Sequence, residues 1–296
     1  MKNVQKNSLK AWVLATRPKT LSAGIIPVVV ASALAYNQDT FRLRPALMCL
    51  LFAVLAQIAS NFSNDYFDFK KKTDNEDRLG PERAVASGWI SPKCMLIGVG
   101  ITILLAVFIG LGLLKYGGTD VLWVGIACVV ALLAYTAGPF PLAYHGLGDL
   151  FVFVFFGVVA VVYTFYVQSY YYEEMAFYAG FALGFQQVNI LILNNYRDRE
   201  NDKLSGKNTT VVLFGEAFGR RMYLWNGIFS VLICLNFLDI SKWASYLPFL
   251  FLIPHYLTWK KMDKIRSGKA LNPLLGETSR NLVILGLLLC IGFFIR

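Results

Sequence analysis

The sequence predicts an all-α membrane protein, a polytopic bundle of about nine transmembrane helices. Of its 296 residues, 56% are apolar and only 16% are charged, and the mean hydropathy is +0.53. Soluble domains usually carry about 25% charged residues. Long apolar runs recur along the chain, and about 20 such residues cross a bilayer as a helix. This composition excludes disordered, collagen-like and disulfide-rich chains, and it nearly excludes an ordinary soluble enzyme.

Nine apolar segments are long enough to be spans, and several are rich in glycine, which suits close helix packing in lipid. No linker or low-complexity segment separates them, so residues 1–296 are predicted to form one integral-membrane domain. The predicted spans are residues 20–36, 45–68, 93–114, 119–137, 148–168, 174–197, 218–237, 243–259 and 275–295.

The basic residues predict the orientation of these spans. With the N-terminus in the cytoplasm, 23 of the 28 Lys and Arg residues fall on the cytoplasmic side and 5 on the other. Such a bias is the positive-inside pattern of multi-pass proteins. It accounts for the net charge of +10 without a nucleic-acid partner. We therefore expect a multi-pass protein of the inner (cytoplasmic) membrane, with the lipid bilayer as its partner and its N-terminus in the cytoplasm.

The cysteines and histidines carry no recognisable site. The five cysteines are scattered through apolar segments without metal or redox spacing, so we expect them to be buried as small apolar side chains. His145 and His255 are isolated, and a packing or interfacial role is favoured over metal ligation.

Acidic residues gather in two windows, at residues 61–83 and 194–207, which hold nine of the 18 Asp and Glu. Each window begins at the cytoplasmic end of an even-numbered span with the pattern Asn-x-x-x-Asp, and the two copies are offset by 133 residues. Parallel internal repeats are common in membrane bundles. The offset predicts a pseudo-repeat of roughly residues 1–140 and 141–270.

Helical spacing places the acids of each window on one face. Asn61, Asp65 and Asp68 are spaced i, i+4 and i+7. In the second window the corresponding residues, at i, i+4 and i+8, are Asn194, Asp198 and Asp202. Unpaired charge near hydrocarbon is costly, so two such faces at one membrane depth predict a cation between them. Mg²⁺ fits, since it takes one or two carboxylates and completes its shell with water and phosphate oxygens.

Basic residues interleave with these acids, and the polar character continues inward at Gln57 and Gln187. Acids for a metal and bases for phosphate oxygens together predict a metal-bridged diphosphate site facing the cytoplasm. The plainer alternative is a pair of solvated loops of mixed charge. The bases at this surface are Arg17, Lys19, Lys70, Lys71, Lys72, Arg78, Arg83, Arg197, Lys203 and Lys207.

The two windows resemble the Asp-rich motifs of the UbiA-type intramembrane aromatic prenyltransferases, and the resemblance covers nearly the whole chain. Finer motifs are similar to the branch that prenylates 1,4-dihydroxy-2-naphthoate in menaquinone synthesis. In order, they are Arg17-Pro-Lys-Thr20, Asn64-Asp-Tyr-Phe-Asp68 followed by Asp74 and Asp77, Gly80-Pro-x-Arg83, Tyr135-Thr-x-Gly-Pro139, Gly146-Leu-Gly-Asp149 and Asn194-Asn-Tyr-Arg-Asp198.

The resemblance implies an Mg²⁺-dependent transfer of a polyprenyl group from polyprenyl diphosphate to 1,4-dihydroxy-2-naphthoate, with loss of carbon dioxide and diphosphate. It implies a metal held by Asp65, Asp68, Asp198 and Asp202. Asn61 and Asn194 would orient those carboxylates or contact the metal. The residues implied to bind diphosphate or substrate are Asn61, Asn64, Asn194, Arg17, Lys19, Lys70, Arg78, Arg83, Lys203, Lys207 and Tyr135.

One departure concerns the Tyr-x-x-x-Lys element that many relatives carry near the end of the fourth span. Tyr135 is followed by Thr-Ala-Gly-Pro139, so another base must take that phosphate contact. Lys203 and Lys207 are the first candidates, and Arg17 and Lys19 are rivals. For Tyr135, interfacial anchoring competes with a substrate role. For Asp149, a favourable charge at a helix N-terminus competes with acceptor binding.

Three alternatives remain open at the level of sequence. The first is a prenyltransferase of the same superfamily with another acceptor, such as 4-hydroxybenzoate, homogentisate, a tetrapyrrole or a glycerol phosphate. The second is a transporter with cytoplasmic acidic gates, although transporter sites usually lie near the midplane of the bilayer. The third is an inactive lipid-binding relative, which the two intact Asp motifs disfavour.

Overall fold

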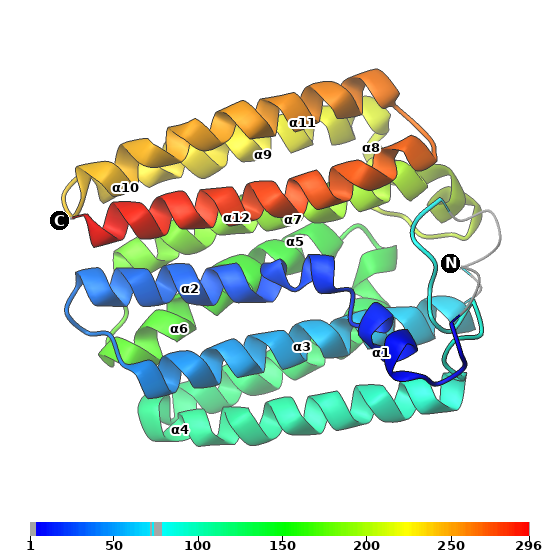
Figure 1. Cartoon of the computed structure of the whole chain (residues 1–296), viewed down its shortest axis with the longest axis horizontal. Helices are drawn as coiled ribbons and strands as arrows, with labels where there is room; N and C mark the ends of the chain where they lie inside the picture. Colours follow the sequence, from blue (N-terminus) through cyan, green and yellow to red (C-terminus); the bar gives the residue numbers. More distant parts are fainter. Residues whose placement is uncertain (1–3, 72, 74–78, 296) are drawn as a thin grey trace.

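Long helices that run side by side along one axis make up the described part of the chain (Figure 1). The computed structural model describes residues 4–71, 73 and 79–295. These residues form helices and turns, with no strand among them. The predicted all-α class is confirmed, in keeping with the need of a chain in lipid to satisfy its backbone groups internally.

The helical elements follow one another with short connections, and a few are 3₁₀ turns or, in η3, a π-helix. In chain order they are α1 (Leu9–Ala15), η1 (Pro18–Thr20), α2 (Ser22–Asn37), α3 (Leu43–Lys70), α4 (Pro92–Thr136), η2 (Leu142–Tyr144), α5 (Gly148–Val152), η3 (Phe153–Val159), α6 (Ala160–Ser169), α7 (Glu174–Leu204), α8 (Thr210–Phe214), α9 (Glu216–Cys234), η4 (Leu235–Phe237), α10 (Lys242–Tyr246), η5 (Leu247–Phe251), α11 (Leu252–Ile265), η6 (Lys269–Leu271) and α12 (Asn272–Phe294).

The N-terminal segment bends before it enters the bundle. Ser8 caps α1 by accepting the backbone N–H of Ala11 at 3.3 Å. Arg17 then takes a left-handed conformation, with φ of 52°. The segment from Leu9 to Thr20 consequently meets α2 at an angle of 51°. This bend sets Arg17 and Thr20 against the C-terminal end of α3, where Arg17 Nη2 donates to the carbonyl of Asn61 at 3.4 Å.

The third and fourth predicted spans are the two arms of α4. The helix begins with Ser91 as its N-cap and Pro92 in its first turn. It breaks at Gly118, whose φ of 58° and ψ of −148° lie outside the helical region. A residue without a Cβ adopts this conformation readily. The two arms are therefore separated by a break at a single glycine and not by a loop.

The predicted span at 148–168 is one rod made of α5, η3 and α6. Its wide π-helical turn lies directly against α7, because both elements carry glycines at the contact. A Cβ placed on Gly157 would lie 2.4 Å from the Cα of Gly184. This close approach brings α7, which carries the second acidic window, next to the rod, as small residues allow in membrane bundles.

By length and apolar composition, five of the described helices qualify to cross a membrane. The number is six if the segment Leu9–Thr20 and α2, which meet at a bend, count together as one span. The other predicted spans coincide with helices that fail this test for visible reasons. The two arms of α4 count as one helix. The segment from Lys242 to Ile265 is divided into α10, η5 and α11 at Pro248, and α9 begins with charged residues.

The two ends of the described chain lie at opposite ends of the bundle (Figure 1). The C-terminal ends of α3 and α7 lie at the same end as the N-terminus, beside α1 and α8. The largest apolar core joins α2, α6, α7, α9 and α12. All five cysteines are free thiols and are buried or half-buried, as expected. His255 is buried and stacks on Tyr223 and Phe251, whereas His145 stacks on Phe140.

Candidate active site

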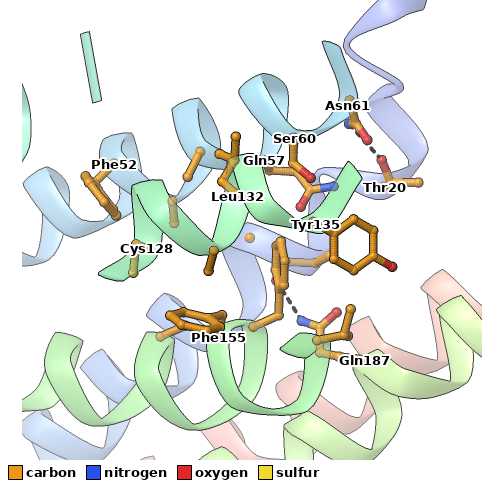
Figure 2. Close-up of a pocket in the computed structure, with 18 of the residues that line it drawn as sticks. Thr20, Phe52, Gln57, Ser60, Asn61, Cys128, Leu132, Tyr135, Phe155 and Gln187 are labelled. Atoms are coloured by element: carbon orange, nitrogen blue, oxygen red, sulfur yellow. Dashed lines mark hydrogen bonds between the residues drawn. The ribbon is translucent and has the colours of Figure 1, made fainter. Parts of the chain in front are cut away.

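A cavity of about 1110 Å³ lies between α3, both arms of α4, the α5–α6 rod and α7. Figure 2 shows part of it, with α3 on one wall, Cys128, Leu132 and Tyr135 of α4 on the next, and Phe155 and Gln187 opposite. Most of its length is apolar. Apolar side chains on this stretch include Phe52, Val107, Leu111, Leu114, Val121 and Phe155.

Polar side chains gather at one end of the cavity. In Figure 2, Asn61, Gln57 and Tyr135 lie together on the side away from Phe52 and Cys128. This end brings together many of the residues that the sequence predicted to bind substrate. They are Arg17, Lys19, Asn61, Asn64, Asp65, Arg83, Tyr135 and Asn194. The cavity therefore has a charged head and a long apolar body.

The first motif, Asn61 to Asp68 of the first acidic window, occupies the last turns of α3. Its Asn61, Asp65 and Asp68 side chains are all buried. The amide of Asn61 donates to the carbonyl of Thr16 at 2.9 Å and to Thr20 Oγ1 at 3.3 Å (Figure 2). Asp65 accepts the backbone N–H groups of Ala84 and Val85 at 3.0 Å each. The carboxylate of Asp65 thus holds the segment after Arg83 against α3.

Asp68 faces the loop that follows α4. Its Oδ1 accepts the hydroxyl of Tyr144 at 2.9 Å, and its Oδ2 lies 3.7 Å from Arg83 Nη2. Lys71, one residue past the end of α3, donates to the carbonyl of Thr136 at 2.8 Å. Burial lowers the pKa of the Lys71 ammonium, and the charge of Asp68 acts against this shift.

The second motif lies near the C-terminal end of α7. Arg197 and Asp198 form a buried, two-bonded ion pair. The same guanidinium donates to Asn194 Oδ1 at 2.7 Å and to Asn272 Oδ1 at 3.1 Å. The amide of Asn272 donates in turn to the carbonyl of Leu79 at 2.9 Å. Arg197 and Asn272 therefore tie α7 and α12 to the segment that follows the first motif.

Asp202, one turn further along α7, is buried and lies 3.6 Å from Lys207 Nζ. Between the two carboxylates of α7, Asn201 donates to the carbonyl of Thr73 at 3.0 Å. Asp68, Asp198 and Asp202 do not line the cavity, and each has a basic side chain beside it. From the sequence we expect a metal ion to balance the negative charges of these carboxylates. In the structure Arg83, Arg197 and Lys207 balance them.

The remaining predicted residues are distributed differently. Lys70 and Lys203 are exposed and do not line the cavity. Lys207 lines a second, small chamber together with Tyr135, Asp149 and Thr210. Asp149 is buried in the first turn of α5 and accepts the hydroxyl of Thr210. Lys72, Asp74, Asp77 and Arg78 lie outside the described residues.

The polar end suits a hard divalent cation by its chemistry. Its uncharged oxygen atoms belong to amides and hydroxyls, and two of the amide oxygens, Asn64 Oδ1 and Gln57 Oε1, are buried without a hydrogen-bond partner among the described residues. Over those residues, no three His, Cys, Asp or Glu side chains gather as a metal cluster. Mg²⁺ takes only one or two carboxylates and keeps water or phosphate oxygens, so the cavity carboxylates, Asp65 and Glu82, and the amide oxygens beside Asp65 fit it.

Several residues at this end were not predicted from the sequence. Asn201 and Asn272 connect α7 and α12 to the segment that follows α3, at Thr73 and Leu79. The hydroxyl of Tyr144 bonds to Asp68 and to Thr73. Asn201 lies within the second acidic window, which gave a signal for it. Thr73 and Tyr144 lie in connecting segments, and Asn272 begins α12. No helical periodicity or motif spacing in the sequence points to these three residues.

Comparisons with known proteins place the chain in a family. The family profile described as "UbiA prenyltransferase family" matches residues 24–274. The 1,4-dihydroxy-2-naphthoate octaprenyltransferase of Escherichia coli (strain K12) is 33% identical, over 100% of this chain and 98% of that protein. The enzyme of the same name from Haemophilus influenzae is 31% identical, over 99% of each.

Among solved structures, a UbiA homolog from Archaeoglobus fulgidus bound to DMAPP and Mg²⁺ superimposes with a TM-score of 0.65. The alignment covers 96% of this chain and 97% of that one at 15% sequence identity. At that identity the likeness shows that the two chains share a fold.

Proposed function

The chain belongs to the UbiA prenyltransferase family, and from this membership we propose that it transfers a polyprenyl group from polyprenyl diphosphate to 1,4-dihydroxy-2-naphthoate. The products are carbon dioxide, diphosphate and the prenylated naphthoquinol of demethylmenaquinone. The printed names of its full-length relatives support the acceptor. The observation that carries the proposal is the cavity, with a charged head and an apolar body about 1110 Å³ in volume.

In this reaction the isoprenoid tail lies in the apolar body and the diphosphate at the charged head. Arg17, Lys19 and Arg83 line the head and bind the phosphate oxygens. Asp65, Asp68, Asp198 and Asp202 would hold the metal between the two motifs, with the amide oxygens of Asn61 and Asn194. The metal would compete there with Arg83, Arg197 and Lys207, which lie beside the three outer carboxylates. When bound, Mg²⁺ supplies a Lewis acid that neutralises the negative charge of the leaving diphosphate.

The bond changes balance without a further reactant. The allylic C–O bond breaks, and its electron pair leaves with diphosphate. The ring carbon that bears the carboxylate forms the new C–C bond. The bond from that carbon to the carboxylate then breaks, and its electrons restore the aromatic ring as carbon dioxide departs. Tyr135, an aromatic side chain at the polar end of the cavity (Figure 2), would stabilise the allylic cation by cation–π contact.

We also propose nine membrane crossings, with the N-terminus and the charged head at the cytoplasmic face of the inner membrane. The opposite placement of the chain ends (Figure 1) supports an odd number of crossings. The Lys and Arg bias of the sequence supports the orientation. The matching polar ends of α3 and α7 support a single domain built from two related halves, near residues 1–140 and 141–270.

The experiment that tests the function is an assay on membranes with polyprenyl diphosphate, Mg²⁺ and 1,4-dihydroxy-2-naphthoate, run in parallel with 4-hydroxybenzoate. Mass spectrometry identifies the product. We expect a prenylated naphthoquinone without the carboxylate, and no product after chelation of the metal by EDTA. Prenylated hydroxybenzoate would assign another acceptor, and uptake of substrate with intact diphosphate would favour a transporter.

A further inference from the structure

Tyr144, at the end of η2, is a buried tyrosine that contacts the first motif on two sides. Its hydroxyl donates to Asp68 Oδ1 at 2.9 Å and lies 2.7 Å from Thr73 Oγ1. An ionised carboxylate only accepts hydrogen bonds, so the single hydroxyl proton of Tyr144 goes to Asp68. The hydroxyl of Thr73 is then the donor to Tyr144, and the three groups form an ordered chain.

The ring and backbone of Tyr144 reach the second motif as well. Lys207 Nζ, which pairs with Asp202, lies 5.8 Å from the centre of the Tyr144 ring, and Lys71 Nζ lies 4.3 Å from it. The carbonyl of Tyr144 accepts the backbone N–H of Asn208 at 3.1 Å. One tyrosine therefore touches the end of α3 and the segment that follows α7.

We propose that Tyr144 is a positioning residue that orients Asp68 toward the metal and keeps the outer carboxylates of the two motifs, Asp68 and Asp202, in register. The inference rests on the proposed function, because it assumes a divalent metal at the charged head. Tyr144 contacts neither the cavity nor the reacting atoms in this arrangement. Its effect passes through the carboxylate that it holds.

The expected effect follows from the behaviour of carboxylates that bind metals. Such ligands are themselves hydrogen-bonded, and loss of the outer partner typically lowers metal affinity about 10–100-fold. Tyr144→Phe removes the hydroxyl and keeps the ring between Lys71 and Lys207. It should therefore weaken metal binding while leaving the lining of the cavity unchanged.

The test uses the full chain in detergent, without substrate. Mn²⁺ binding is measured by electron paramagnetic resonance, with Mg²⁺ as competitor. We expect the dissociation constant of Tyr144→Phe to rise about 10–100-fold, and its turnover to recover as Mg²⁺ is raised, with no change in the KM for the acceptor. The matched control is Tyr178→Phe, which removes a hydroxyl bonded to Glu174 at the far end of α7.

The outcomes separate the inference from the function on which it rests. Equal Mn²⁺ affinity of wild type and a folded Tyr144→Phe variant overturns the positioning role. A lower thermal stability with unchanged affinity also overturns it, since that result describes a structural role alone. Absence of Mn²⁺ binding by the wild type overturns the proposed metal site itself.

If Tyr144→Phe does not fold, Thr73→Val provides a second test. It removes the group that donates to the Tyr144 hydroxyl and keeps the shape of the side chain. Hydrogen bonds in a chain strengthen one another, so the dissociation constant for Mn²⁺ should rise in the same direction by a smaller factor. An unchanged constant in a folded Thr73→Val variant counts against the proposal.

Discussion

Arg197 and Asp198, neighbours in the sequence, form a two-bonded ion pair inside the bundle. Arg197 Nε lies 2.8 Å from Asp198 Oδ1, and Arg197 Nη2 lies 2.5 Å from Asp198 Oδ2. The Arg197 side chain has no exposed surface. The cation that the sequence predicts beside this carboxylate is, in this structure, a residue of the chain itself. Asp198, which we propose as a metal ligand, is therefore also the partner of a buried guanidinium.

Asp198→Asn should abolish turnover and also destabilise the protein. The substitution leaves a buried guanidinium without its carboxylate, and breaking a buried ion pair costs about 3–5 kcal/mol. The double variant Arg197→Gln with Asp198→Asn removes both charges, so it should regain much of the stability and remain inactive. Thermal unfolding in detergent and the product assay measure the two effects separately.

Arg199→Gln is the control for this pair. Arg199 lies on the same helix, but it pairs with Glu216, which is partly exposed. The Arg199–Glu216 pair is less buried than the Arg197–Asp198 pair, so this variant should lose less stability than Asp198→Asn and should keep its turnover. Normal turnover in Asp198→Asn would remove that residue from the proposed site.

Asp65→Asn should stop turnover and loosen the segment after Arg83. The carboxylate accepts two backbone N–H groups, at Ala84 and Val85, and an amide offers only one oxygen. One buried N–H loses its partner, at a cost of about 1–3 kcal/mol. Limited proteolysis between residues 79 and 91 should become faster. Asp39→Asn makes the same chemical change in the connection between α2 and α3, and it should alter neither property.

Gly125→Phe should shorten the prenyl chain that the enzyme accepts. Gly125 lines the apolar body of the cavity, and a Cβ at this position would meet no atom within 4 Å. It lies ten residues from Tyr135, about 15 Å along the helix. Competition between short and long polyprenyl diphosphates, read by mass spectrometry, measures the shift. Gly100→Phe, on the exposed side of the other arm of α4, should leave the preference unchanged.

Two introduced cysteines should report opposite sides of the membrane. Ser267 follows α11 and Asn236 follows α9, and both are exposed. With nine crossings, a membrane-impermeant maleimide should label Ser267→Cys in inside-out vesicles and Asn236→Cys in intact spheroplasts. The native thiols are buried or half-buried, so their background is low. Labelling of both positions from one side would contradict the proposed topology.

The sequence sets the helical class and the pairing of the two polar windows because both depend on local pattern. Apolar runs of about 20 residues form helices in lipid whatever their neighbours are. The spacing of Asn61 and Asp65, and of Asn194 and Asp198, places each pair on one face of a helix. Figure 1 shows these two helix ends together at one end of the bundle.

Contacts between distant segments were decided only by the tertiary structure. Tyr144 and Asp68 are 76 residues apart, and Arg197 and Asn272 are 75 apart. No spacing rule links such pairs. The sequence also placed a loop where Gly118 alone turns α4 back, and a continuous span where Pro248 divides α10 from α11. Helical periodicity fixes which face a side chain occupies, whereas packing of the whole bundle fixes which partner it meets.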